Sequence, residues 1–373
     1  MKGCISQLWI DKPERCSGGL AAFLRSAWET SPDLFSSAGP IGDKEVLEDV
    51  IPVYQAWKRL RKMRASKEKW SEADYVATVY NAIRSPAVQE SVYRVQCSIS
   101  LPQPLWDDAD PPNTDIFRVL STKTAVPDCA IFLPSSLTRA LSQSSKSPYK
   151  VLKNHPTVIK AGTTVRGSSF RYQSTPCTQL PDLPGFEFIS SICEDKKPTH
   201  THADDAYRQN RIATASAVRH LHSLNIKSPV IGLIWANGTV RAHVDWCQVE
   251  DGKLTVLSAP YSGSDEEDFQ SSQPFLEWDL SDPSDILQVY YLVRNIDHWT
   301  CTEFCKRVVA GLEDSVECIT RSNGPYHPWK WIKNPAHAPT LRVLKENNTT
   351  SATTTTTSGT LSPPKKSRHR RRR

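Results

Sequence analysis

The chain has 373 residues, of which 38% are hydrophobic, and this size allows one large or two modest globular domains. Its formal net charge is +6, but residues 365–373 contain seven Lys and Arg, and removing these charges from the total leaves −1. The body of the chain is therefore close to neutral, which excludes a protein that coats nucleic acid with its whole surface. Eleven Trp and eleven Tyr residues argue against disorder over most of the length.

The cysteines and the apolar segments restrict the compartment. The ten cysteines include no CxxC pair, and the first residues contain no apolar run long enough for a secretion signal. No segment approaches the roughly 20 apolar residues that a membrane-spanning helix needs. We therefore expect free thiols, a reducing nuclear or cytoplasmic compartment, and no membrane partner.

Two helices are predicted in the first quarter of the chain. Residues 1–40 show no clear periodicity. Residues 43–65 place apolar side chains on one side and crowd Lys and Arg at the end, which predicts an amphipathic helix. A second helix is predicted from Ser71, because Ser71 and Asp74 have the spacing of a capping box, and Ser85-Pro86 is expected to end it.

Predicted strands alternate with one long helix in the middle of the chain. Apolar patterns predict strands over 92–101, 125–133 and 186–193, with residues 135–182 as an insertion or long loop. Asn237-Gly238 is a strong hairpin signal. The other predicted elements are a helix at 204–224, strands at 229–235, 239–246 and 254–259, and a helical pattern over 284–312.

This order of elements predicts an α/β fold, with a mixed-sheet core and helical additions at both ends. From Glu346 the sequence consists mainly of Asn, Thr and Ser and then of a basic run, and this composition predicts a disordered tail. The expected division is an N-terminal helical extension over 1–69, a main domain over 70–345 with a helical C-terminal part, and the tail over 346–373.

Acidic residues at two neighbouring strand ends are the main chemical signal. Asp128 begins one predicted strand, and Glu194 and Lys196 end the next. Two carboxylates placed in this way can bind one Mg²⁺, with waters and a substrate phosphate completing its shell. Lys196 shares a strand face with Glu194, so that its ammonium can neutralise charge on a phosphorane. Asp195 points the other way, and its carbonyl is the atom that can still reach a metal.

These residues carry a resemblance to a known family. The pattern Pro127-Asp128 followed by Glu194-Asp195-Lys196 resembles the signature of the PD-(D/E)XK nuclease superfamily, which has the restriction-endonuclease-like fold. Over roughly two thirds of the chain, residues 70–310 resemble the nuclease-like domain of many uncharacterised fungal proteins. The matching segments, in order, are WSEADYVATVYNAI, AVPDCAIFLP, ISSICEDKK, AYRQNRIATASAVRHL and PVIGLIWANGTVRAHVDW, and PFLEWDLSDPSDILQVYYLVRNIDHW resembles the family's C-terminal helical extension.

The resemblance implies an αβββαβ core and assigns roles to single residues. It implies that Asp128 and Glu194 bind Mg²⁺ or Mn²⁺, and that Lys196 positions the nucleophile or stabilises the transition state. Glu72 and Gln209 are supporting candidates, the first for the ion's shell and the second for the substrate backbone or the active-site strand. The implied partner is nucleic acid, either DNA or RNA.

Alternatives stay open at this point. Asp128 also fits a turn acid after proline, Glu194 and Lys196 fit a solvated strand end, and Glu72 fits an ordinary first-turn acid. A zinc site at His298, Cys301 and Cys305 is disfavoured, because structural zinc sites usually show two tight ligand pairs. A catalytically silent module that binds nucleic acid or protein competes with the nuclease. The basic run Lys365–Arg373 is predicted to bind an import receptor, which favours the nucleus over the cytoplasm, or to add nonspecific phosphate contacts.

Overall fold

The residues that the computed structural model describes belong to the first of two units of the chain, Met1–Asn334. No helix of this described part has the length and apolar character that a bilayer span requires. The Thr-rich and basic tail predicted over 346–373 lies outside the described residues. The described ranges are 5–11, 17–36, 43–102, 123–161, 169–196, 203–236, 238–263, 275–322, 324 and 326–329.

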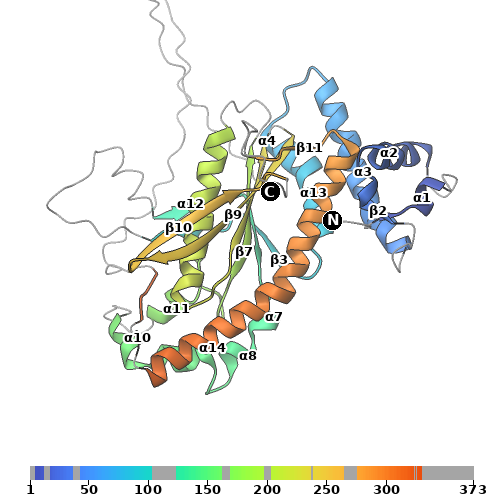
Figure 1. The fold of residues 1–373 in the computed structure, drawn as a ribbon. Helices are drawn as coiled ribbons and strands as arrows, with labels where there is room; N and C mark the ends of the chain where they lie inside the picture. Colours follow the sequence, from blue (N-terminus) through green and yellow to red (C-terminus); the bar gives the residue numbers. More distant parts are fainter. Residues whose placement is uncertain are drawn as a thin grey trace, which may run out of the picture. The chain divides into compact units, whose positions relative to one another are not determined.

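A mixed sheet runs through this unit, with the strand order β10-β9-β8-β7-β6-β3 and β11 paired to β9 (Figure 1). Only the β7–β8 pair is parallel, and the other neighbours are antiparallel. The strands are β3 (Val92–Val95), β6 (Cys129–Phe132), β7 (Ile189–Lys196), β8 (Val230–Ala236), β9 (Thr239–Glu250), β10 (Lys253–Pro260) and β11 (Trp278–Asp279).

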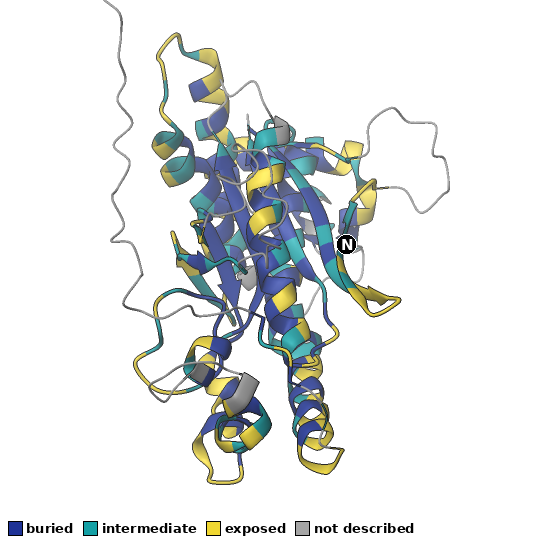
Figure 2. Ribbon diagram, turned by 90° about the vertical axis from the view of Figure 1, so that its left-hand side faces the viewer, coloured by how far each residue is buried: buried dark blue, intermediate teal, exposed yellow. Residues whose placement is uncertain are grey.

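Helices cover both faces of the sheet. A parallel pair needs a crossover connection, and α12 (Ala203–Ser223) supplies it between β7 and β8. One hydrophobic cluster packs α12 against Ile192 and Val230, and a second packs α5 (Asn81–Ala87) and α13 (Pro283–Trp299) against Cys193 and Leu233. The central strands are therefore buried on both sides (Figure 2), and a polar side chain inside them has to find a partner in the protein.

The helix that precedes β3 begins as predicted. Ser71 Oγ accepts the N–H of Asp74 at 3.2 Å, and Asp74 Oδ2 accepts the N–H of Ser71 at 2.8 Å, so the capping box is confirmed. The helix continues through α4 (Glu72–Tyr75), a π-helical turn at Val76–Tyr80 and α5. Pro86 lies inside its last turn, and the helix ends at Ala87 rather than before the proline.

The single strand predicted over 92–101 is wrong. After β3 the backbone turns at Gln96, which has a φ of 48°, and residues Ile99–Ser100 form β4, paired with β5 (Thr124–Ala125) outside the main sheet. The N–H of Gln96 donates to the carbonyl of Asp128 at 2.9 Å. This bond ties the turn to the residue before β6, a long-range contact that the local apolar pattern does not contain.

The insertion predicted over 135–182 forms short helices in its described parts rather than an open loop. Tyr149, Leu152 and Phe170 from these helices are buried in the same cluster as α12, which explains why the segment folds. The helices are α7 (Ser135–Thr138), α8 (Ala140–Gln143), α9 (Pro148–Asn154), α10 (Pro156–Ala161) and α11 (Ser169–Gln173).

Helical additions precede and follow the sheet, as predicted. The helix predicted over 43–65 is α3 (Asp43–Ala65), which contacts α5 and α13. Residues before it, which lack periodicity, form α1 (Leu8–Asp11), α2 (Gly18–Thr30) and a 3₁₀ turn at Pro32–Leu34, and a short parallel pair joins β1 (Ile5–Ser6) to β2 (Phe35–Ser36). After α13, a π-helical turn at Thr300–Phe304 leads into α14 (Cys305–Arg321).

Candidate functional site

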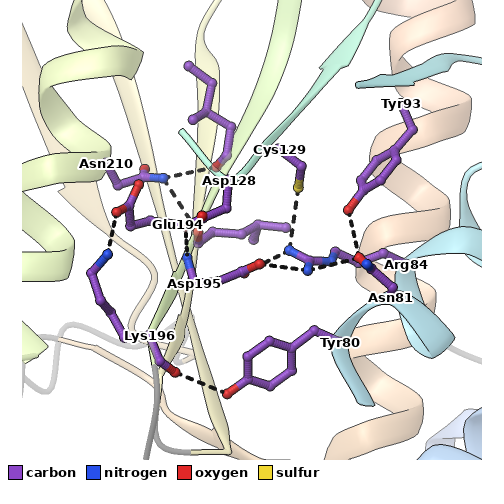
Figure 3. A network of polar contacts seen from close by, with 12 residues as sticks. Tyr80, Asn81, Arg84, Tyr93, Asp128, Cys129, Glu194, Asp195, Lys196 and Asn210 are labelled. Carbon is purple, nitrogen blue, oxygen red and sulfur yellow. Dashed lines mark hydrogen bonds and ion pairs between the residues drawn. The ribbon is translucent and has the colours of Figure 1, made fainter. Parts of the chain in front are cut away.

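The two predicted metal-binding acids face each other across the β6–β7 pair. Cys129 pairs with Cys193, and extending this antiparallel register by one residue places Asp128 opposite Glu194. Both cysteines belong to the cluster on the α5 and α13 side, so the alternation of side chains turns Glu194 to the α12 side. Asp128 precedes β6 and lies close enough for its charge to raise the pKa of Glu194. Opposite residues of this kind have Cβ atoms about 4.5–5.5 Å apart. Figure 3 shows the two acids together beside α12.

Hydrogen bonds hold both carboxylates in place. The backbone N–H of Asp195 donates to Asp128 Oδ2 at 2.6 Å, and Lys196 Nζ donates to Glu194 Oε1 at 2.6 Å. The prediction that Lys196 shares a strand face with Glu194 is therefore confirmed. Tyr80 supports the end of β7, since its hydroxyl donates to the carbonyl of Lys196 at 3.5 Å.

Burial shapes the charges of this trio. Burial is the largest cause that raises the pKa of Glu194, to about 7, while the hydrogen bond from Lys196 lowers it and the charge of Asp128 raises it further. Burial also raises the pKa of Asp128, although the hydrogen bond from the N–H of Asp195 lowers it. For Lys196 burial lowers the pKa, but the bond to Glu194 and the charges of both acids outweigh it, and the net pKa is raised. Lys196 is thus a cation at neutral pH, where Glu194 titrates.

Glu72 lies close enough for its charge to act on Asp128 and Lys196. It is the first residue of α4 and is half-buried. Its negative charge raises the pKa of Asp128 and of Lys196. The structure therefore brings three of the predicted acids and the lysine into one electrostatic neighbourhood, with Glu72 reaching it from the helix and the others from the sheet.

Asp195 occupies the opposite face of β7, as the alternation predicts. Its carboxylate accepts two hydrogen bonds of 2.8 Å each from Arg84 of α5, and both side chains are only 1% exposed. Arg84 also donates to Asn81 Oδ1 at 3.1 Å and to Cys129 Sγ at 3.4 Å (Figure 3). The carboxylate is committed to Arg84, so only its backbone carbonyl stays a predicted metal ligand. Arg84 is not among the predicted site residues, although a basic residue next to the apolar stripe of this helix is a signal in the sequence.

The support expected from Gln209 comes from the next residue. Gln209 is exposed on α12, whereas Asn210 is buried and donates to the carbonyls of Ile192 at 3.1 Å and Leu233 at 3.5 Å, so that it links β7 to β8. His243 Nε2 lies 2.7 Å from Asn210 Oδ1, and His243 Nδ1 lies 3.2 Å from Asp245 Oδ1. Gln209 stays a candidate for contact with a substrate only.

A glycine makes room for this buried network. A Cβ on Gly232 would lie 2.0 Å from His243 Nε2 and 2.3 Å from Asn210 Oδ1. Both distances are far below van der Waals contact. Position 232 of β8 therefore has to be glycine, because Asn210 of α12 and His243 of β9 form their hydrogen bond directly beside it. The network ties β7 at Ile192, two residues before Glu194, to β8 at Leu233.

The donor set fits a hard divalent cation held by few protein ligands. Within the described residues, no group of three or more His, Cys, Asp or Glu side chains is placed to hold a metal ion. Asp128 Oδ1 and Glu194 Oε2 are the atoms not used in the bonds to Asp195 and Lys196. Mg²⁺ binds through one or two carboxylates with waters and phosphate oxygens, which this pair can satisfy. Neither a protein-family model nor a curated protein matches the chain.

Proposed function

We propose that the chain is a Mg²⁺-dependent nuclease that hydrolyses phosphodiester bonds at the Asp128, Glu194 and Lys196 site. The observation that carries the proposal is the opposed pair of carboxylates with a lysine bonded to one of them at 2.6 Å. A structural role alone does not require a half-buried lysine and two acids on one face at the end of two adjacent strands. Clusters of titratable groups with shifted pKa values are typical of functional sites.

The order of the elements supports a restriction-endonuclease-like core. Leaving aside the β4–β5 pair, which lies outside the main sheet, and the short helices α7 to α11 between β6 and β7, the chain runs α5, β3, β6, β7, α12, β8, which is the αβββαβ order. The acids stand at the start of the second core strand and the end of the third, as the PD-(D/E)XK pattern requires. The nuclease proposal and the fold proposal therefore use the same residues.

Each residue has a distinct chemical task in this proposal. A divalent ion bound between the two acids would polarise the scissile phosphate and acidify a water molecule. Asp128, oriented by the N–H of Asp195, and Glu194 supply its protein ligands. Lys196 stays protonated and places a positive charge where the phosphorane develops negative charge. Glu194, with a pKa of about 7, is partly protonated near neutral pH and has to be ionised to serve as a ligand.

The first experiment offers the purified full chain plasmid DNA, single-stranded DNA and RNA, with Mg²⁺, with Mn²⁺ or with EDTA. We expect cleavage of at least one substrate that depends on the divalent cation and stops in EDTA. Calorimetry with Mn²⁺ is run in parallel. A folded protein that binds no Mn²⁺ and cleaves nothing would instead support the catalytically silent binding module.

The affinity for the cation is expected to depend on pH. Glu194 has its pKa raised to about 7, mainly by burial, so it is protonated below that pH and must lose the proton when a cation binds. The affinity for Mn²⁺ should therefore fall about tenfold per pH unit below pH 7 and level off above about pH 8. Calorimetry at pH 5.5, 6.5, 7.5 and 8.5 measures this, with Glu194→Gln as the control that removes the titrating group. An affinity that stays constant across this range would contradict the assignment of Glu194 as a ligand.

A further inference from the structure

A strongly basic segment leads from α3 to the candidate site. Seven of the twelve residues from 58 to 69 are Lys or Arg, and Glu68 is the single acid among them. We call its exposed members the basic strip. These members lie in the last two turns of α3 and in the connection to α4: Lys58, Arg61, Lys62, Arg64, Lys67 and Lys69.

Direct contacts connect the basic strip to the end of β7. The guanidinium of Arg64 packs against Gly238, where an added Cβ would lie 2.6 Å from Nη2. The N–H of Gly238 donates to the hydroxyl of Tyr80 at 3.3 Å, and that hydroxyl lies 3.5 Å from the carbonyl of Lys196. The connection after Lys69 enters α4 at Glu72, whose charge acts on Asp128. In Figure 1 the end of α3 and α4 lie at the same end of the sheet.

The charged groups of the basic strip are presented to solvent. Lys62, Lys67 and Lys69 form no ion pair with any residue that the structure describes, whereas Arg64 is bonded to Asp279 at 2.9 Å. Lys58 extends over the ring of Tyr54 at 5.4 Å and Arg61 over that of Trp57 at 4.8 Å. These rings direct the two cations along the helix while leaving their charges exposed.

The buried side of α3 argues against a lipid surface as the partner. Val53, Leu60 and Met63 are buried in the protein core. A helix that binds at a membrane inserts its apolar face among the lipids, and here that face is already occupied by the protein. What α3 offers outward is a row of cations, which fits a linear polyanion better than a bilayer.

We propose that the basic strip is a binding surface for the phosphate backbone of a nucleic acid strand, and that it guides the strand to the Asp128 and Glu194 site. The span from Lys58 to Lys62 covers about 6 Å along the helix, which equals about two phosphates at about 3.4 Å of rise per nucleotide of one strand. Contacts of this kind position a substrate without reading its sequence. The inference rests on the proposed function, and it adds the surface by which the substrate is held.

The test measures binding in EDTA, so that cleavage does not interfere. The variant Lys62→Gln, Lys67→Gln, Lys69→Gln removes three exposed charges of the basic strip. The matched control Lys146→Gln, Lys253→Gln, Lys306→Gln removes three exposed charges from other parts of the described chain. Labelled duplex and single-stranded DNA are titrated with each protein at 50 to 300 mM NaCl. Circular dichroism and thermal melting confirm that both variants fold.

We expect the basic-strip variant to bind DNA about 10-fold or more weakly at 100 mM NaCl, and its log–log salt slope to fall by roughly 2 to 3. The control should stay within about twofold of wild type. Equal losses in the two variants, or no binding of either DNA by wild type, would overturn the proposal. A second result would also overturn the proposal. In it, the wild-type protein binds phosphatidylserine vesicles more tightly than DNA, and the basic-strip variant loses this vesicle binding.

The two proposals can fail separately. If the basic-strip variant binds like the control while cleavage still depends on Mg²⁺ and Asp128, the surface is wrong and the nuclease stands. If DNA binding is lost in the basic-strip variant although wild type cleaves nothing, the surface stands and the nuclease falls.

Discussion

Replacing Asp128 by Asn or Glu194 by Gln is expected to lower the rate of Mg²⁺-dependent cleavage by about 10³-fold or more. Each change removes one of two carboxylates that hold the ion, and several kcal/mol of transition-state stabilisation depend on that ion. Replacing Lys196 by Met should cost about 10²- to 10³-fold, because a cation aimed at the developing charge is lost. Initial rates on the substrate that wild type cleaves best measure all three effects.

The two acid-to-amide substitutions keep the local hydrogen bonds. The amide oxygen introduced by Asp128→Asn can still accept the N–H of Asp195, and the amide oxygen introduced by Glu194→Gln can still accept from Lys196. Matched controls are Glu313→Gln, Asp314→Asn and Lys306→Met, which make the same chemical changes at exposed positions of α14. Cleavage that persists at the wild-type rate in Asp128→Asn would place the reaction at another site or in a contaminant.

Replacing Arg84 by Met is expected to reduce the free energy of unfolding by about 3–5 kcal/mol. The substitution leaves the carboxylate of Asp195 1% exposed without its cation, inside a cluster of apolar side chains. It also removes the contact of the guanidinium with the ring of Trp235, whose centroid lies 4.9 Å away. Urea unfolding at pH 7, followed by tryptophan fluorescence and circular dichroism, measures the loss.

A double variant separates the charge from the packing. Arg84→Met with Asp195→Leu removes both charges, and we expect it to recover most of the lost stability, because the penalty comes from the unpaired carboxylate. Arg307→Met is the control, since the ion pair of Arg307 with Glu303 is about half exposed and should contribute less than about 1 kcal/mol. A single Arg84→Met variant as stable as this control would show that the buried pair is not needed for folding.

Local patterns were sufficient where neighbouring residues decide the structure. The amphipathic period of residues 43–65 predicted α3, and the Ser71 and Asp74 spacing predicted the start of α4. Alternation along β7 predicted that Lys196 meets Glu194 and that Asp195 faces away. Pattern reasoning failed at Gln96 and at residues 135–182, where a turn and a set of short helices depend on contacts with distant segments.

What the sequence by itself determined is the set of acids, their strand faces and the order of the elements around them, because residue spacing controls which side a strand or helix residue points to. Only the tertiary structure decided that the carboxylate of Asp195 pairs with Arg84 while that of Glu194 pairs with Lys196. Arg84 reaches Asp195 across 111 positions, and Asn210 rather than Gln209 links β7 to β8, because α12 turns one of two adjacent polar residues inward. Such pairings follow from strand register and helix packing, which bring together residues far apart in the chain.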